Sequence, residues 1–250
     1  MWRSQFGCGE DAIIFSHGES NARGVLIAFR EDVTYKINAQ HVDKNGRYIV
    51  LNALIDDNPV ILINYYAPNI ETEQLNVLNE LHNILDHLDI EENTTFIWGG
   101  DFNLTFDINL DTDGGSPKLK VKSISKIIAM MPENDICDIY RIRYPDSRRF
   151  TWRKKTPFMQ RRLDYFLISD NLQETVKSIE IIPSVQSDHS AIKIIFCPLQ
   201  DELRGRSYWK FNNSLIEDKE YIAALKTQIL TFENDVSDFN DPIFRWEFIK

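Results

Sequence analysis

Residues 94–103 read Thr94-Thr95-Phe96-Ile97-Trp98-Gly99-Gly100-Asp101-Phe102-Asn103, an apolar run that closes on two glycines, an acid and an amide. The branched and aromatic residues predict a short buried strand, and the glycines mark the point where it gives way to a loop. Two further motifs, Arg161-Arg162-Leu163-Asp164-Tyr165 and Ser187-Asp188-His189-Ser190, also adjoin apolar segments. A rigid sheet presents reactive side chains at such strand ends, so these three motifs hold the candidate functional residues.

The rest of the chain alternates between strand and helix patterns. Segments rich in branched and aromatic residues, and therefore predicted as strands, are 24–29, 47–55, 60–66, 150–152, 163–168, 176–182 and 191–196. The turn composition of Asp56-Asp57-Asn58-Pro59 predicts a hairpin between 47–55 and 60–66. Apolar residues recur at spacings of three and four over 75–88 and 121–131, which predicts two amphipathic helices. Many strands with only two good helices favour an α+β fold, a two-sheet β-sandwich flanked by helices, over a doubly wound parallel sheet.

Charge is distributed unevenly along the chain. The 250 residues have a formal net charge of -10, which by itself argues against a nucleic-acid partner. Between Lys118 and Arg162, however, thirteen Lys and Arg accompany only four acids. Four aromatic residues lie among these charges: Tyr144, Phe150, Trp152 and Phe158. The mixture suits phosphate contact and base stacking, and a solvated cationic face without a partner is the alternative.

The sequence changes in character near residue 199. We expect one large domain over residues 1–198 and a polar linker with a helical tail over residues 199–250. No apolar run approaches the roughly 20 residues needed to span a bilayer. The first residues lead into no apolar signal core. We therefore expect no membrane partner and a location inside the cell.

The acidic motifs combine hard oxygen ligands with one imidazole. Asp101, Asn103, Asp164, Asp188 and His189 include no thiolate and no second clustered histidine. Such a set selects Mg²⁺, or Mn²⁺, over zinc. It is equipped for phosphate-ester hydrolysis, because a metal neutralises phosphate charge while a carboxylate or imidazole handles water. Taken singly, each motif has a structural alternative, an Asx turn for Asp101 and a surface pair for Asp188 and His189.

In these motifs the chain resembles the endonuclease/exonuclease/phosphatase superfamily, whose members include the abasic-site endonucleases and DNase I. The matching stretches are Tyr65-Tyr66-Ala67-Pro68-Asn69, Gly100-Asp101-Phe102-Asn103, Arg162-Leu163-Asp164-Tyr165-Phe166-Leu167-Ile168-Ser169 and Ser187-Asp188-His189-Ser190-Ala191. Residues 15–24 and 208–215 are most similar to the endonuclease domain of LINE-type (non-LTR) retrotransposons and to its connector to a reverse transcriptase. The resemblance implies a DNase I-like four-layer fold and a Mg²⁺-dependent DNA endonuclease that nicks target DNA, nuclear where it is functional and covalently linked to a reverse transcriptase.

The resemblance also implies catalytic roles. His189 would stand beside the scissile phosphate as general base or transition-state stabiliser, and Asp164 would accept its other ring N–H and fix the tautomer. Asp188 and Asp101 would hold the metal. Asp101 would also position or deprotonate the attacking water, and Asn103 would bind the phosphate.

Further positions would complete the phosphate pocket and the contact with DNA. Tyr66 and Asn69 would line the phosphate pocket, while Arg161 and Ser187 would bind phosphate or DNA. Thr151 matches a family DNA-contact position, although a β-branched strand residue could equally lie there for packing alone.

One part of the family pattern is missing from the chain. The family domain opens with a strand ending in asparagine and a later strand ending in the glutamate that is its principal metal ligand, and neither precedes the hairpin here. We therefore expect an N-terminally truncated domain that lacks its first strand, its first helix and one metal ligand. The alternatives to an endonuclease, which truncation would impair, are a catalytically inactive retrotransposon remnant and a non-LINE phosphoesterase of the same superfamily.

Overall fold

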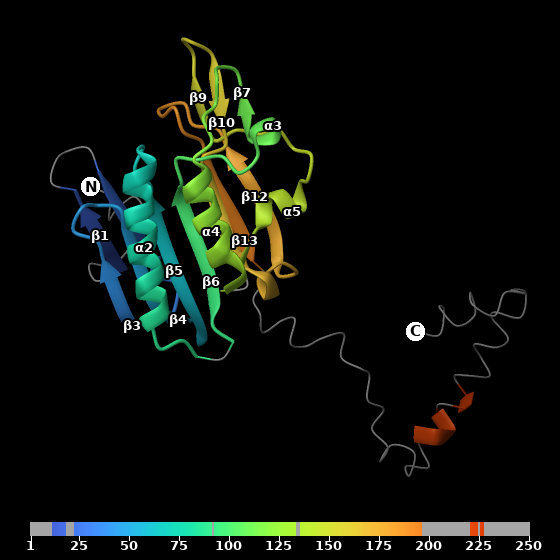
Figure 1. The fold of residues 1–250 in the computed structure, drawn as a ribbon. Helices are drawn as coiled ribbons and strands as arrows, with labels where there is room; N and C mark the ends of the chain where they lie inside the picture. Colours follow the sequence, from blue (N-terminus) through green and yellow to red (C-terminus); the bar gives the residue numbers. More distant parts are fainter. Residues whose placement is uncertain are drawn as a thin grey trace, which may run out of the picture. The chain divides into compact units, whose positions relative to one another are not determined.

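A six-stranded sheet forms the centre of the molecule, with strand order β3-β4-β5-β6-β11-β8 (Figure 1). The computed structural model describes residues 12–18, 23–91, 93–133, 136–196, 221–224 and 226–227. The six strands are β3 (Tyr35–Val42), β4 (Tyr48–Ile55), β5 (Asn58–Tyr66), β6 (Thr95–Asp101), β8 (Ile136–Asp138) and β11 (Asp164–Ser169). All neighbours pair antiparallel except β5 and β6, which are parallel. The parallel pair is joined by the crossover helix α2 (Glu71–His87), as parallel strands require.

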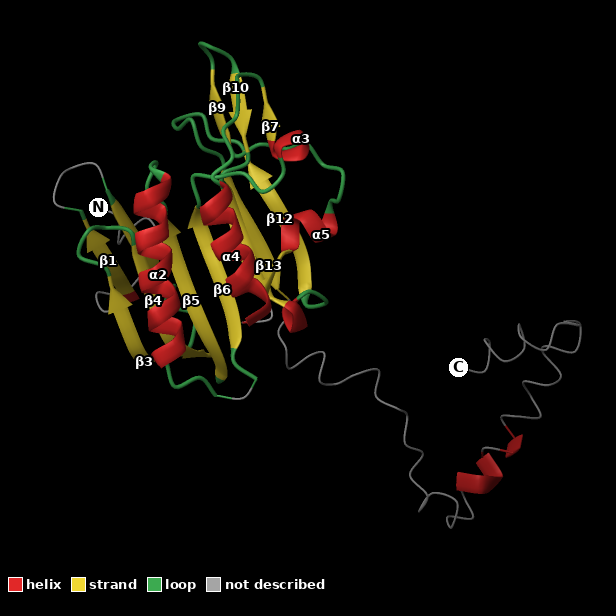
Figure 2. Ribbon diagram, viewed as in Figure 1, coloured by secondary structure: helices red, strands yellow, loops and turns green. Residues whose placement is uncertain are grey.

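The helices α2 and α4 (Val121–Glu133) cover one face of this sheet (Figure 2). Leu78 and Leu81 of α2 and Ile127 and Met130 of α4 are fully buried. They belong to one core cluster with alternate residues of the strands, among them Val50, Ile61, Ile63, Phe96, Trp98 and Leu167. Since side chains alternate along a strand, these residues share one face. Both predicted helices are confirmed.

The opposite face of the sheet carries two antiparallel hairpins. One pairs β1 (Ile13–His17) with β2 (Gly24–Ala28), and the other pairs β12 (Val176–Ile182) with β13 (Ala191–Phe196). Ile49 and Leu51 of β4 pack under the first hairpin, and Ile168 of β11 packs under the second. The predicted two-sheet sandwich is therefore present, but within the described ranges its second sheet consists of two separate two-stranded sheets.

A small sheet projects at the end of the molecule where β6 finishes (Figure 1). It has the order β7-β10-β9, formed by β7 (Thr112–Asp113), β9 (Trp152–Lys154) and β10 (Met159–Arg161). The short helices α3 (Ile108–Asp111) and α5 (Ile139–Arg143) lie beside it, and the 3-10 helix η2 (Asp170–Leu172) follows β11. Most of the predicted basic stretch thus belongs to this small sheet and its surroundings.

The predicted hairpin between β4 and β5 is present, with a tighter turn than the composition suggests. Asp56 and Asp57 have φ values of 47° and 64°, and two successive positive φ values are typical of a type I′ turn. Asn58 and Pro59 already pair with Ile55 and Leu54 as part of the sheet. The two-residue turn fixes the register of the strands that lead to Tyr66.

The chain divides into two units, Met1–Leu199 and Gln200–Lys250. In the second unit only residues 221–224 and 226–227 are described, and they are helical. The predicted connector at residues 208–215 lies outside the described residues. Among those that are described, no helix combines the length and apolar character needed to cross a membrane.

Candidate active site

Two of the three acidic motifs meet where β6 and β11 pair. Asp164 lies directly opposite Asp101 in the register of these two strands. His189, in the loop before β13, adds its imidazole: Nδ1 is 2.9 Å from Asp164 Oδ2, and Nε2 is 4.0 Å from Asp101 Oδ2. Ligand atoms of the three side chains lie within 4.8 Å of one another. Asp101 and Asp164 are 63 residues apart in the sequence, and Asp164 and His189 are 25 apart, yet the three form one half-buried group.

Hydrogen bonding sets the state of the imidazole. A carboxylate can only accept, so His189 donates its Nδ1–H to Asp164 and leaves Nε2 toward Asp101. The hydrogen bond to Asp164 is the largest effect on His189 and raises the pKa of the imidazole. Burial, followed by the charge of Asp164, raises the pKa of Asp101 from 3.8 to about 6. The group therefore contains a carboxyl with a raised pKa beside an imidazole whose protonated form is favoured by Asp164, an arrangement typical of functional sites.

Gly100 explains why a glycine precedes Asp101. It has a φ of 141°, and a Cβ at this position would overlap the carbonyl oxygen of Tyr65 on the neighbouring strand. Only glycine permits this conformation and this close approach. The strand end that carries Asp101 is consequently pressed against β5.

The Asx turn predicted as a structural alternative is present at Asp101. The Asn103 backbone N–H donates to Asp101 Oδ1 (2.8 Å), and Asn103 adopts a φ of 48°. Asn103 Nδ2 donates to the Ala67 carbonyl (2.8 Å), so the amide ties the β6 loop to the β5 loop. A turn and a site role are compatible, because the turn orients the carboxylate.

Two residues that bond to the loops of the site, Gln74 and Lys120, belong to none of the sequence motifs. Gln74 is fully buried in α2, and its Nε2 donates to the carbonyls of Pro68 (2.7 Å) and Phe102 (3.2 Å). Lys120 Nζ donates to the Asn103 carbonyl (2.7 Å), and burial lowers the pKa of this lysine. A polar residue one turn before Leu78 on the buried stripe could have indicated Gln74, whereas no local signal identifies Lys120.

Of the predicted phosphate-pocket residues, Tyr66 pairs with Asp101 in the register of β5 and β6. Tyr66 is half-buried, with the Arg47 guanidinium 5.2 Å from the ring centroid, and Asn69 is exposed. Ser187 Oγ accepts the His189 backbone N–H (3.1 Å), which stabilises the loop that presents the imidazole.

Asp188 points away from the three-residue group. Its Oδ2 accepts the indole N–H of Trp152 (2.8 Å), and its side chain is exposed. Asp188 is not among the grouped ligand atoms of Asp101, Asp164 and His189. The hydrogen bond from Trp152 occupies Oδ2 and leaves Oδ1 as a possible ligand atom, and the role of Asp188 as a metal ligand stays a prediction.

Thr151 and Arg161, predicted to bind DNA, have internal partners. Thr151 is fully buried, and its Oγ1 accepts the backbone N–H groups of Leu163 (2.9 Å) and Asp164 (3.1 Å). Arg161 is 9% exposed and donates to the backbone carbonyls of Asp113 (2.9 Å) and Gly114 (2.8 Å). In this conformation the Thr151 hydroxyl is buried and bonded, and three of the five N–H donors of Arg161 bind backbone carbonyls.

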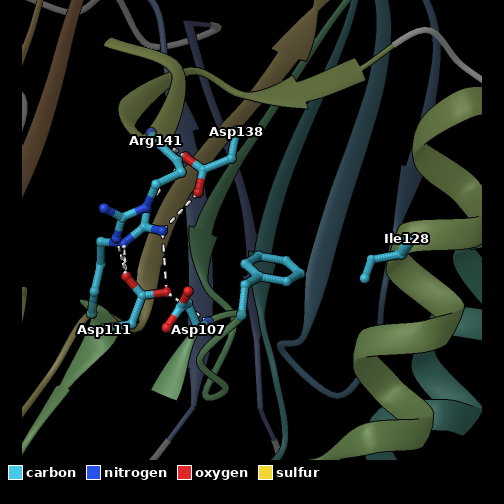
Figure 3. A pocket seen from close by; sticks show the side chains of 7 residues that line it. Asp107, Asp111, Ile128, Asp138 and Arg141 are labelled. Carbon is cyan, nitrogen blue, oxygen red and sulfur yellow. Dashed lines mark hydrogen bonds and ion pairs between the residues drawn. The ribbon is translucent and has the colours of Figure 1, made fainter. Parts of the chain in front are cut away.

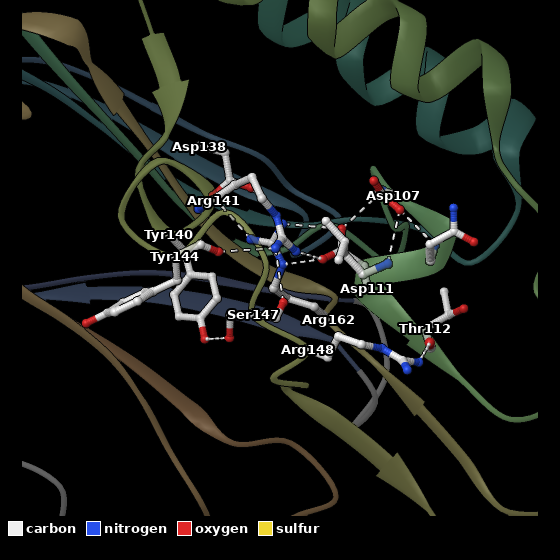
Figure 4. A network of polar contacts seen from close by, with 12 residues as sticks. Asp107, Asp111, Thr112, Asp138, Tyr140, Arg141, Tyr144, Ser147, Arg148 and Arg162 are labelled. Carbon is white, nitrogen blue, oxygen red and sulfur yellow. Dashed lines mark hydrogen bonds and ion pairs between the residues drawn. The ribbon is translucent and has the colours of Figure 1, made fainter.

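A buried ion-pair network binds two more cations of the basic stretch, Arg141 and Arg162 (Figures 3 and 4). Asp111, 0% exposed, accepts from Arg162 Nε (2.7 Å) and from Arg141 Nη2 (2.6 Å). Asp138 accepts from both terminal nitrogens of Arg162 (2.7 and 3.1 Å). The network lines a cavity of about 240 Å³ whose charged groups mainly bind one another. Arg141 and Arg162 thus stabilise the fold, and the exposed cations of the basic stretch include Arg153, Lys154 and Lys155.

Three known proteins and one family model are similar to this chain. The "Transposon TX1 uncharacterized 149 kDa protein" of Xenopus laevis is 26% identical over 216 residues, which are 86% of this chain but only 16% of that protein. An AP endonuclease from Archaeoglobus fulgidus has a similar fold (TM-score 0.57, 19% identity, 78% of this chain and 81% of that chain). So does the 3'-5' exonuclease NExo from Neisseria meningitidis (TM-score 0.54, 17% identity, 77% and 81%). These likenesses confirm the predicted DNase I-like α+β fold and agree with the resemblance to retrotransposon proteins. The model of the endonuclease/exonuclease/phosphatase family matches residues 3–189, and the chain belongs to this family.

Proposed function

We propose that this chain is a divalent-metal-dependent DNA endonuclease that nicks target DNA for a LINE-type retrotransposon. The observation that carries the proposal is the hydrogen-bonded Asp164–His189 pair with Asp101 4.0 Å from the free imidazole nitrogen. The family and the transposon relative support both the class of reaction and the biological setting.

The side chains divide the chemistry of phosphodiester hydrolysis among them. Asp101, with its pKa of about 6, positions water and accepts its proton as the water attacks phosphorus, while the P–O bond to the leaving sugar oxygen breaks and that oxygen takes up a proton from solvent. His189 stands beside the phosphate and stabilises the charge that develops there, while Asp164 holds the imidazole in one tautomer. Asn103, Tyr66 and Asn69 are proposed to bind the phosphate, with Ser187 supporting the His189 loop.

The donor set fits a hard divalent cation. Asp101 and Asp164 face each other across two strands, and their mutual repulsion contributes to the raised pKa of Asp101. A cation between carboxylates relieves such repulsion, and oxygen ligands favour Mg²⁺, with Mn²⁺ as a substitute. Asp101 and Asp188 would hold the ion, which when bound neutralises charge on the phosphate.

DNA is the proposed partner, and the exposed cations near β9 are its proposed contact. Arg153, Lys154 and Lys155 lie on or next to β9, directly after Thr151, which bonds to Asp164. Because the transposon relative is much longer than this chain, we further propose a covalently linked reverse transcriptase and action in the nucleus.

Nicking of supercoiled plasmid tests the proposal. With Mg²⁺ we expect slow conversion to the open circle, because among the described residues no glutamate joins the group of Asp101, Asp164 and His189, and we expect EDTA to stop it. His189→Ala should lower the rate by about 10²- to 10⁴-fold, the usual range for loss of an acid–base group. His41→Ala, an exposed histidine on β3, is the matched control and should nick like the unaltered chain.

Two outcomes would favour the alternatives. DNA binding without any nicking under these conditions would indicate an inactive remnant. Hydrolysis of a small phosphodiester such as bis(p-nitrophenyl) phosphate, without DNA binding, would indicate a phosphoesterase of the same family.

A further inference from the structure

Thr151 contacts both sides of the Asp164–His189 pair. It precedes β9 and is 0% exposed. Its Oγ1 accepts the N–H groups of Leu163 and Asp164, at 2.9 and 3.1 Å. Its carbonyl accepts the N–H of Ser190, the residue after His189, at 2.6 Å. One buried residue therefore holds the backbone next to both members of the pair.

The neighbouring residues extend this connection. Trp152 forms an isolated antiparallel bridge with His189, and the Arg153 N–H donates to the Asp188 carbonyl (3.0 Å). The segment from Thr151 to Arg153 thus runs beside the His189 loop, and the Thr151 hydroxyl connects this segment to the start of β11. Removing that hydroxyl would remove both hydrogen bonds of the Thr151 side chain, to the N–H groups of Leu163 and Asp164.

We infer that Thr151 is a positioning residue that keeps Asp164 and His189 at hydrogen-bonding distance, and does not itself contact DNA. Its catalytic consequence rests on the proposed nuclease function, but its structural consequence can be measured without activity. A group that is completely buried cannot reach a phosphate on the surface. The remaining alternative is that Thr151 serves packing alone. A packing role depends on the shape of the side chain, whereas a positioning role depends on its hydroxyl oxygen.

Two substitutions separate the oxygen from the shape. Thr151→Val keeps the volume and β-branching but leaves two buried N–H groups without their acceptor. Thr151→Ser keeps the oxygen and loses only a methyl group. Thr175→Val is the matched control, because Thr175 is 3% exposed and its hydroxyl donates to the Leu172 carbonyl (2.8 Å) at the far end of β11.

The first measurement is the imidazole Nδ1 proton of His189, observed by NMR at fixed pH in the metal-free full chain and assigned by its loss in His189→Gln. We expect a slowly exchanging low-field resonance in the unaltered chain, in Thr151→Ser and in Thr175→Val. In Thr151→Val we expect this proton to exchange about tenfold faster, because the hydrogen bond to Asp164 is weakened. Circular dichroism of each variant establishes that it is folded.

The second measurement is plasmid nicking together with DNA affinity. Thr151→Val should lower kcat by about 10- to 100-fold, the scale expected when reacting groups are misplaced by a fraction of an ångström to 1 Å. Its Kd for DNA should stay within about twofold of the unaltered chain, and Thr151→Ser should restore kcat to within about threefold.

Three outcomes have distinct meanings. An unchanged imidazole proton in folded Thr151→Val would overturn the positioning role. A weakened DNA affinity in that variant with an unchanged proton would overturn it in favour of DNA contact. Failure of the unaltered chain to nick DNA would count against the proposed function, and the imidazole measurement would still decide the role of Thr151.

Discussion

Asp111→Ala should destabilise the protein strongly, because this carboxylate is fully buried between two guanidinium groups. Asp111 accepts hydrogen bonds from Arg141 and twice from Arg162, and it also accepts the Asp107 backbone N–H at 3.1 Å. Removing one partner of a buried ion pair costs about 3–5 kcal/mol. Because Arg162 would retain its two bonds to Asp138, we expect the free energy of unfolding to fall by about 3 kcal/mol. This is a large part of a typical domain stability of about 5–15 kcal/mol.

Equilibrium urea unfolding, followed by tryptophan fluorescence, measures this loss as a lower midpoint with an unchanged slope. Asp113→Ala is the matched control on the adjacent strand, because Asp113 is 45% exposed and lies 3.9 Å from Arg148. An exposed pair of this kind contributes about 0–1 kcal/mol. If Asp111→Ala cost no more than Asp113→Ala, the conclusion that the buried network stabilises the fold would be wrong.

Three further predictions concern charge at and near the site. The pKa of Asp101, raised from 3.8 to about 6, means that its ionised form is disfavoured in the folded state. Asp101→Asn should therefore increase the free energy of unfolding of the metal-free protein by up to about 3 kcal/mol at pH 8, while abolishing nicking. Urea titrations at several pH values should show this gain fading as the pH falls from 6 to below 3.8. Mg²⁺ should change the fluorescence of Trp152, because an ion bound by Asp188 alters the carboxylate that accepts the indole N–H; a Mg²⁺-induced change in emission that is the same in Trp152→Phe and in the unaltered chain would contradict the ligand role of Asp188. Lys155→Gln should weaken DNA binding and reduce the salt slope of log K by about 1, whereas Lys36→Gln on β3 should change neither; equal slopes in fluorescence-anisotropy titrations of the two variants would argue against a phosphate contact at Lys155.

The local sequence predicts the strand ends and the helices well, because their signals lie within a few residues. The apolar run of β6 reflects burial on both faces, since Phe96 and Trp98 belong to one core cluster and Ile97 packs against another. The three- and four-residue spacing in α2 reflects burial on one face. Gly100-Asp101 ends β6 as predicted, and Asp164 pairs opposite it. Backbone periodicity and turn chemistry were sufficient for these features.

The local sequence does not predict the partners of charged side chains. Arg162 was counted with the DNA-facing cations, yet it binds Asp111, which is 51 residues away in the sequence. Charge composition does not reveal which cations are neutralised internally, because the pairing depends on how distant segments pack. Asp188 shows the same limit, since its hydrogen bond to Trp152 spans 36 residues.

The four charges of the buried network, Asp111, Asp138, Arg141 and Arg162, have a consequence for how such a sequence can evolve. Their charges sum to zero, and each residue is bonded to another member of the set. A change at one position leaves an uncompensated charge, whereas joint replacement by apolar residues of similar volume can be neutral. We therefore expect these four positions to co-vary among related chains, so that lineages exchange them as a set and single departures mark copies of lowered stability.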